Sequence, residues 1–246
     1  MNPTVDLLNK RKSMRVFENE PIPDEDIRTI LNAAVQAPTP GNMTLWTALL
    51  ITDEEKKKQL SITCDNQPFI ASAPLVIVFC ADYKRWYDLF SALELNEPLR
   101  RPDTGDFLLA AIDTVIAAHS SVTAAESLGY GSCYIGDIIE NEDKQRAILE
   151  LPAYVKPVCM VVYGKPTRQQ LERRKPPRFE LDDVICENTY SQRTPMKEML
   201  GKRQELHGED LDKWLSAFCR RKWNCRFSEE MSRSTQKIID DWKAGI

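Results

Sequence analysis

Apolar residues recur along the chain with two different spacings, and each spacing predicts a different kind of element. Between residues 24 and 37 they fall every three to four positions, as on one face of an amphipathic helix. The residues expected on this face are Ile27, Ile30, Leu31, Ala34 and Val35. Acidic residues open the segment, where they favour the positive end of a helix dipole. The following PTPGN segment ends the predicted helix, because its two prolines and glycine cannot continue it.

The longest apolar segment, residues 106–128, predicts a central helix that is apolar on most of its sides. Gly129 follows it directly and is a natural C-terminal stop. Shorter helices are predicted at residues 53–64 and 141–151, and helical patterns dominate after residue 190. The chain is therefore expected to carry helices throughout its length.

Four further segments are apolar runs of the length of buried strands. They cover residues 44–52, 73–81, 132–138 and 156–164. These strands alternate with helices, but none is followed by the G-x-G-x-x-G turn of a Rossmann nucleotide site, and there is no Walker A loop. Residues 165–190, rich in proline and charge, predict a long ordered loop. The pattern predicts an α+β fold whose ligand is not held in the Rossmann manner.

The composition of the 246 residues, 42% hydrophobic and 28% charged, is typical of a soluble globular protein. No apolar run reaches the roughly 18 to 20 residues of a membrane span, and the N-terminus lacks the apolar core of a signal peptide. We therefore expect a cytoplasmic protein without a membrane partner. The net charge of -4 argues against a general nucleic-acid binder, which usually carries a strongly basic face.

The cysteines and histidines argue against a metal site. The seven cysteines are odd in number, none is paired as C-x-x-C, and several lie in apolar runs, which is typical of reduced, buried thiols. The two histidines, His119 and His207, form no H-E-x-x-H motif. His119 is expected to pack in the core or at an interface. With no Ser/His/Asp or Cys/His set in view, little acid–base machinery is expected.

Two basic groups are candidates for binding an anion. If residues 11–15 are extended, Arg11, Ser13 and Arg15 point the same way, because side chains alternate along a strand. Two guanidinium groups and a hydroxyl on one side suit a phosphate monoester; the alternative is a solvated basic turn. Lys175 and Arg178 lie among prolines that fix the backbone, and their alternative is a solvated charged loop.

Several motifs occur in an order that resembles the FMN-dependent nitroreductase family. The chain has R-x-S-x-R-x-F at 11–17, A-P-T-x-x-N at 37–42, NQPFIASAPLVIVFCAD at 66–82, AAESLGYGSCYIGDIIEN at 124–141, KPPRFELDDVICENTY at 175–190 and RKWNCRFSEEMSRS at 221–234. Each motif alone is a weak signal, but their ordered coincidence is a strong one. The resemblance covers nearly the whole chain and is strongest to the NADPH-preferring flavin reductase and nitroreductase branch.

The resemblance implies a fold, an activity and an assembly. The fold would be a central, mostly antiparallel sheet flanked by helices, in one FMN-binding domain of residues 1–246 with a helical C-terminal extension from 190 to 246. The activity would be FMN-dependent reduction of nitroaromatics, quinones or flavins, with NADPH or NADH as electron donor and ping-pong hydride transfer. The chain would form a homodimer with FMN sites at the subunit interface. No side chain need be catalytic, because the flavin carries the hydride chemistry.

The resemblance also implies which residues hold the FMN phosphate and ribityl chain. Arg11, Ser13 and Arg15 match the positions that bind them. Lys175 and Arg178 match the loop that brings further positive charge, although the register of Lys175 is open by one residue.

The isoalloxazine ring would meet two other segments. Gln67 matches a side chain that hydrogen-bonds the polar edge of the ring, and Tyr134, Ile135 and Gly136 match a segment lying against it. Relatives often have a second glycine where this chain has Asp137. A carboxylate there would disfavour an anionic reduced flavin; alternatively, the side chain turns to solvent.

Two further segments would contact the cofactors, one of them from the partner subunit. Thr39, Pro40 and Asn42 match a segment that reaches FMN from the partner subunit. Arg221 and Arg226 are candidates for the 2′-phosphate of NADPH, with a solvated helix end as the alternative. The function alternatives are a narrow-substrate reductase on the same scaffold (a dehalogenase or an enal reductase), a non-catalytic flavin-binding protein and, more remotely, a basic-patch nucleic-acid binder.

Overall fold

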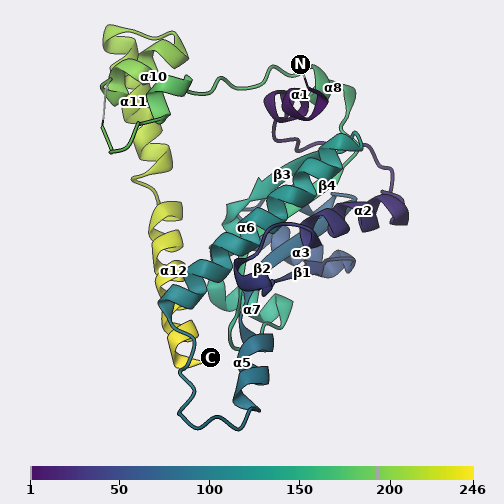
Figure 1. Ribbon diagram of the computed structural model, residues 1–246. Helices are drawn as coiled ribbons and strands as arrows, with labels where there is room; N and C mark the ends of the chain where they lie inside the picture. Colours follow the sequence, from purple (N-terminus) through teal and green to yellow (C-terminus); the bar gives the residue numbers. More distant parts are fainter. Residues whose placement is uncertain (1, 192–193) are drawn as a thin grey trace. The chain divides into compact units, whose positions relative to one another are not determined.

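The computed structural model describes residues 2–191 and 194–246, and its contacts divide the chain into two compact units (Figure 1). The first unit comprises the chain up to Arg173 together with Glu230–Ile246, and the second comprises Arg174–Glu229. That residues 1–246 act as one FMN-binding domain with an extension from residue 190 stays a prediction.

The first unit is built on a four-stranded sheet with the order β1-β2-β4-β3. The strands are β1 (Trp46–Leu50), β2 (Leu75–Asp82), β3 (Gly131–Ile135) and β4 (Val155–Gly164). All three neighbouring pairs are antiparallel, with a register shift between Phe79 and Cys80 where β2 meets β4. The four predicted strands and the antiparallel sheet are confirmed.

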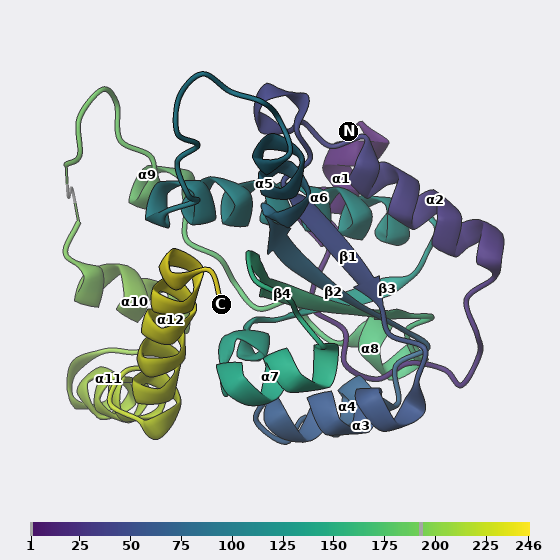
Figure 2. The same cartoon turned by 90° about the horizontal axis from the view of Figure 1, so that it is seen from below.

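Helices cover both faces of this sheet. In the first unit they are α1 (Pro3–Lys10), α2 (Asp24–Val35), α3 (Glu54–Thr63), α4 (Pro68–Ala71), α5 (Lys84–Ser91), α6 (Thr104–Ser127), α7 (Glu142–Leu149) and α8 (Arg168–Glu172), with short 3-10 helices η1 (Pro40–Asn42) and η2 (Gly136–Ile139). Figure 2 shows α1, α2 and α6 on one face and α3, α4 and α7 on the other.

Strand β2 is buried along all eight of its residues because both of its faces are covered. Val76 and Val78 belong to the core cluster that includes Leu60 of α3, while Ile77 belongs to the cluster with Ala117 of α6. Alternate residues of one strand thus enter two separate cores, which accounts for its uninterrupted apolar run.

The central helix α6 is confirmed, and it ends as predicted. Leu128 caps it, and Gly129 has φ +87°, a left-handed conformation that favours glycine. One face of α6 is buried. The other exposes large apolar side chains, which are Leu108, Leu109, Ile112, Val115 and Ile116.

On length and composition alone, α6 is the one helix of the described chain that is apolar enough to cross a membrane. The expectation that no segment reaches this length is therefore wrong by this measure, because Asp113 interrupts an apolar stretch that continues beyond it. The signal is weak, since the core helix of a soluble protein passes the same test, and 39% of the most apolar window of α6 is buried.

Some local expectations fail. Val35 is 57% exposed at the end of α2, whereas Ile30 and Ala34 of the same helix are buried. The proline-rich region 165–190 is not purely a loop, because it contains α8 and the short helix α9 (Leu181–Val184). Helix α1 was not apparent in the apolar pattern because none of its residues is buried.

The second unit is helical, as the pattern after residue 190 predicts. It contains α9, α10 (Met196–Gln204), α11 (Gly208–Lys222) and the first turn of α12 (Arg226–Ala244), whose residues from Glu230 onward belong to the first unit. Leu200 and Leu211 are its buried apolar residues, and Trp214 stacks on Phe218 along α11 with ring centroids 5.0 Å apart.

Candidate functional site

The segment 11–15 lies extended along strand β3. Ser13 pairs with Ser132 in a parallel bridge, and the backbone N–H of Met14 donates to the carbonyl of Ser132 at 2.8 Å. The approach is close enough to require glycine at position 131, where an added Cβ would lie 2.6 Å from Met14 Cγ. The edge of β3 therefore fixes the course of this segment.

Burial alternates along the segment with a period of two. Lys12 and Met14 are 8% and 5% exposed, whereas Arg15 is exposed and Arg11 is partly exposed. This agrees with an extended backbone that turns residues 11, 13 and 15 to one side. Two guanidinium groups and a hydroxyl are thus carried on the same side of one short segment.

The buried Lys12 side chain holds the segment 11–15 against helix α8. Its ammonium donates to the carbonyl of Leu171 at 2.8 Å and to that of Arg173, and Arg173 in turn donates to the carbonyl of Ser13 at 2.5 Å. The Gln170 side chain accepts a bond from the backbone N–H of Arg15 at 3.2 Å. Helix α8 and the residue after it hold the segment in place.

Arg11 lies in a polar cluster with Glu126 of α6 and Ser132 of β3. Its guanidinium donates to Ser132 Oγ at 3.3 Å, and Nε lies 3.6 Å from Glu126 Oε1. The Ser132 hydroxyl donates to Glu126 at 3.0 Å. Burial raises the pKa of Glu126, while the Ser132 hydrogen bond and the charge of Arg11 oppose the rise. The cluster fixes the direction of the Arg11 side chain.

Arg15 reaches the segment that contains Gln67. Its guanidinium carbon lies 5.9 Å from the centre of the Phe69 ring in α4, a distance typical of a cation–π contact. Gln67 precedes this helix, and its side-chain amide donates to the carbonyl of Cys64 at 2.9 Å. The structure thus brings Arg15 and the Gln67 segment together.

The end of β3 lies close to the same cations. Burial raises the pKa of the Cys133 thiol, and the charge of Arg15 and a hydrogen bond from Ser13 act in the opposite direction. Next to it, Tyr134 is partly exposed and Gly136 is exposed, but Ile135 is 1% exposed and packs in the core. The side chain of Ile135 is therefore not available to a ligand.

The segment containing Thr39, Pro40 and Asn42 forms a tight turn before β1. Gly41 and Asn42 have φ values of +57°, and Thr44 has +53°. Asn42 is exposed, and Thr39 and Pro40 are partly exposed. The turn presents its middle residues outward while its ends are held by side chains of other elements.

The family of the chain follows from three comparisons. Residues 8–165 match the model of the Nitroreductase family. An FMN reductase (NADPH) of Bacillus subtilis is 33% identical over 196 residues, which are 79% of this chain and 77% of that protein. The chain belongs to the nitroreductase family. An FMN reductase [NAD(P)H] of the same organism is 30% identical over 91% of this chain and 89% of its own length.

A solved structure of a family member has the same architecture. The NfrA1 nitroreductase of Bacillus subtilis is similar with a TM-score of 0.74 and 27% identity, covering 98% of this chain and 97% of that one. The resemblance inferred from the ordered motifs is therefore confirmed, and so is the nitroreductase fold. The residue-by-residue roles stay predictions.

Negative charge gathers at the other end of the candidate site, beyond Gly136. Burial raises the pKa of Glu140 to about 7, and the charges of Asp137, Asp65 and Glu230 add to the rise. Asp137 itself is partly buried in η2. Positive charge therefore lies along residues 11–15, and negative charge lies around η2.

The other basic candidates belong to the second unit. Arg178 is exposed and donates to the carbonyl of Pro176 at 3.1 Å, and Lys175 is partly exposed. Arg221 is exposed near the end of α11, with its guanidinium carbon 5.8 Å from the centre of the Phe218 ring. Arg226 is exposed at the start of α12. The roles of these four residues stay predictions.

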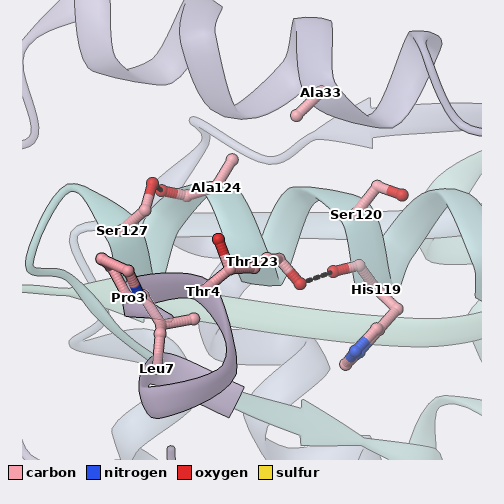
Figure 3. A pocket seen from close by; sticks show the side chains of 9 residues that line it. All are labelled: Pro3, Thr4, Leu7, Ala33, His119, Ser120, Thr123, Ala124 and Ser127. Carbon is pink, nitrogen blue, oxygen red and sulfur yellow. Dashed lines mark hydrogen bonds between the residues drawn. The ribbon is translucent and has the colours of Figure 1, made fainter. Parts of the chain in front are cut away.

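A pocket of about 590 Å³ lies elsewhere on the first unit, between α1, α2 and α6 (Figure 3). The residues that line it are Pro3, Thr4, Leu7, Ala33, His119, Ser120, Thr123, Ala124 and Ser127. None of them is among the predicted FMN ligands. His119 is exposed, so its core interpretation is wrong, and its interface interpretation stays a prediction.

Several residues that shape the site were not predicted from the sequence. Lys12 occupies one of the inward positions of the alternating pattern in residues 11–15, so its burial could have been predicted from that pattern. Glu126, Gln170 and Arg173 act on the segment from positions far away along the chain, so no local pattern identifies them. Within the described residues, no group of three or more His, Cys, Asp or Glu side chains could hold a metal ion.

Proposed function

We propose that the chain is an FMN-dependent NAD(P)H oxidoreductase that reduces nitroaromatics, quinones or flavins. The observation that carries this proposal is the arrangement of Arg11, Ser13 and Arg15 on one side of a segment clamped to β3. Two planar guanidinium donors and a hydroxyl match the acceptor oxygens of a phosphate monoester. The FMN reductases among the relatives support the same cofactor.

The residues around this segment fit the rest of the cofactor. Gln67 would serve the polar edge of the ring, and Tyr134 and the backbone of Ile135 would lie against it. Gly136 is exposed, and an added Cβ there would meet nothing within 4 Å. That open space beside a backbone without a side chain suits the close approach of a flat ring.

The chain would bind and orient the reactants, while bound FMN supplies hydride acceptance and donation. NAD(P)H and the acceptor would use the same face in turn, which gives ping-pong kinetics. Arg221 and Arg226 would meet the 2′-phosphate of NADPH, and Lys175 and Arg178 would add charge at the FMN phosphate. No side chain is assigned a catalytic proton transfer.

The assembly that we propose is a cytoplasmic homodimer with FMN at its interface. The apolar side chains on the outer face of α6 form a stripe that supports burial against a second copy, because burying one such side chain contributes about 1.5 to 3 kcal/mol. In this dimer, Thr39, Pro40 and Asn42 of one chain would reach the FMN of its partner. Neither a membrane nor a nucleic acid is part of the proposal.

Anaerobic addition of NADPH to the purified, FMN-loaded protein tests the activity. The flavin's visible absorption band should bleach rapidly and return when menadione or nitrofurazone is added. A band that persists after NADPH would contradict a reductase and favour a flavin-binding protein without turnover. Reoxidation by only one of nitrofurazone, menadione and free FMN would favour a narrow-substrate enzyme.

A further inference from the structure

Asp113 carries a buried carboxylate in the middle of α6. It is 1% exposed, and no described Lys, Arg or His lies within ion-pair distance of it. A buried charge without a cation is unfavourable unless hydrogen bonds replace its hydration. The donors around Asp113 therefore decide what the residue does.

Both hydrogen bonds to Asp113 come from the turn before β1. Its Oδ2 accepts from the Thr39 hydroxyl at 2.7 Å and from the backbone N–H of Leu45 at 2.7 Å. The Thr39 hydroxyl oxygen also accepts from the backbone N–H of Thr44 at 2.8 Å. One carboxylate oxygen therefore ties the two ends of the turn 39–45 together.

The turn between these ends needs such a clamp. Its left-handed backbone at Gly41, Asn42 and Thr44 includes two residues that are not glycine, and Thr44 is β-branched. Backbone of this kind is unfavourable by itself and persists where surrounding contacts determine it. Trp86 supports the middle of the turn by donating to the carbonyl of Met43 at 2.8 Å, while Asp113 holds both of its ends, together with the bond from Thr44 to Thr39.

We propose that Asp113 is a positioning residue for FMN, which holds the turn 39–45 in the shape that presents Pro40 and Asn42 to the cofactor of the partner subunit. The inference rests on the proposed function. It assigns the work to Oδ2 alone, because Oδ1 is buried and accepts no hydrogen bond from the described residues. A neutral side chain of the same shape can therefore do the same work.

Two substitutions at this position separate hydrogen bonding from charge. Asp113→Ala removes the acceptor shared by Thr39 and Leu45, and it should raise the dissociation constant of FMN about tenfold. Asp113→Asn keeps an amide oxygen that can accept from both donors. Its NH₂ group replaces Oδ1, which accepts no hydrogen bond from the described residues. It should stay within about threefold of the wild-type value. Quenching of FMN fluorescence on binding measures both constants.

Thr39 supplies the second test through its coupling to Asp113, because Thr39 is itself proposed to reach FMN. Thr39→Val should weaken FMN binding, and adding Asp113→Ala to it should cause little further loss, since both changes break the same hydrogen bond. If Asp113→Ala does not fold, Asp113→Val takes its place against Asp113→Asn. Losses from the two single variants that add fully in the double variant would overturn the proposal.

The control is Asp106→Ala in the first turn of the same helix. Asp106 accepts a hydrogen bond from the backbone N–H of the N-cap Asp103 and pairs with Arg100 at 2.5 Å, so this variant should lower the melting temperature without touching the turn 39–45. The FMN dissociation constant of its folded fraction should equal that of the wild type. If Asp106→Ala and Asp113→Ala weaken FMN binding equally, Asp113 acts only through general stability and the proposal fails.

A mixed dimer tests whether the turn serves the partner. An Asp113→Ala chain and an Arg15→Ala chain are co-expressed with different tags, and the mixed dimer is purified. One of its two sites then combines an intact Arg15 from the first chain with an intact turn from the second. That site should bind FMN with wild-type affinity. A mixed dimer that binds no better than its parents would overturn the proposal.

The two proposals fail in different ways. If the wild-type dimer takes up no FMN, the proposed function falls and this inference falls with it. If the wild type binds FMN tightly and Asp113→Ala binds it equally well, the proposed function stands and the role of Asp113 alone is refuted.

Discussion

The basic side chains of the two units are held in different ways. In the first unit, Arg11 and Arg15 sit on a segment paired with β3, and Arg11 is directed by Glu126 and Ser132. In the second unit, Arg178 and Arg221 are exposed on a proline-rich loop and near a helix end. A cation on a backbone segment that is already held in place loses less conformational entropy on binding than one on a loop or helix end that the ligand must order. We therefore expect tight cofactor binding from the first group and weaker nucleotide selectivity from the second.

The largest effect is expected at Arg15. Arg15→Ala removes one of the few cations that we propose to face the FMN phosphate and should raise the FMN dissociation constant about a hundredfold. The matched control is Arg28→Ala on the exposed side of α2, which should leave FMN binding unchanged. Equal effects of the two variants would mean that only overall charge matters, and the comparison would fail.

A second substitution tests whether pairing with β3 fixes these cations. In Gly131→Ala the new Cβ meets Met14, and the displaced segment should cost about 1 to 3 kcal/mol of stability and weaken FMN binding. Gly105→Ala is the control, because its Cβ would meet nothing within 4 Å in the first turn of α6. Denaturant unfolding and FMN titration measure both. If Gly131→Ala is destabilised but binds FMN with unchanged affinity, the pairing of residues 11–15 with β3 does not position the cations for FMN.

A smaller effect is expected from the exposed cations. Arg221→Ala should raise the KM for NADPH about five- to tenfold, because one solvent-screened contact to the 2′-phosphate is lost, and leave that for NADH nearly unchanged. Steady-state kinetics with both nucleotides measures this. An equal rise for both would remove Arg221 from the 2′-phosphate site.

The smallest effect concerns the carboxylates around η2. Because the pKa of Glu140 is raised to about 7 in the folded protein, the folded protein binds a proton at Glu140 more tightly than the unfolded chain does. Stability should therefore fall as pH rises from about 4.3, the unfolded value, through 7. Glu140→Gln should raise the melting temperature near pH 8 and change it little near pH 5. A melting temperature raised equally at both values would contradict the shifted pKa.

Different parts of the site differ in how far the sequence predicts them. Residues 11–15 are predictable because the period-two pattern is local, and burial of Lys12 and Met14 agrees with it. The hydrogen bonds that Asp113 makes to the turn 39–45 are not predictable. Asp113 lies 74 positions from Thr39, and the sequence shows it only as a polar residue within an apolar helix. Burial of Ile135 also depends on how β3 packs, which the Y-I-G motif alone does not specify.

The fold shows the same division. The strands and α6 follow from long apolar runs, but α1 buries no residue and so lacks the periodic signal, although Asn2 caps it by accepting from the N–H of Thr4 at 2.9 Å. Val35 has the right spacing for the buried face of α2, yet it is exposed at the end of the helix. Local patterns therefore predict elements better than they predict the limits of the packed core.

The most direct measurement is a titration of the cofactor-free protein with FMN, followed by the quenching of flavin fluorescence. The account predicts one tightly bound FMN for each chain, with binding weakened about a hundredfold in Arg15→Ala and unchanged in Arg28→Ala. A folded wild-type protein that leaves the flavin fluorescence unchanged would contradict it.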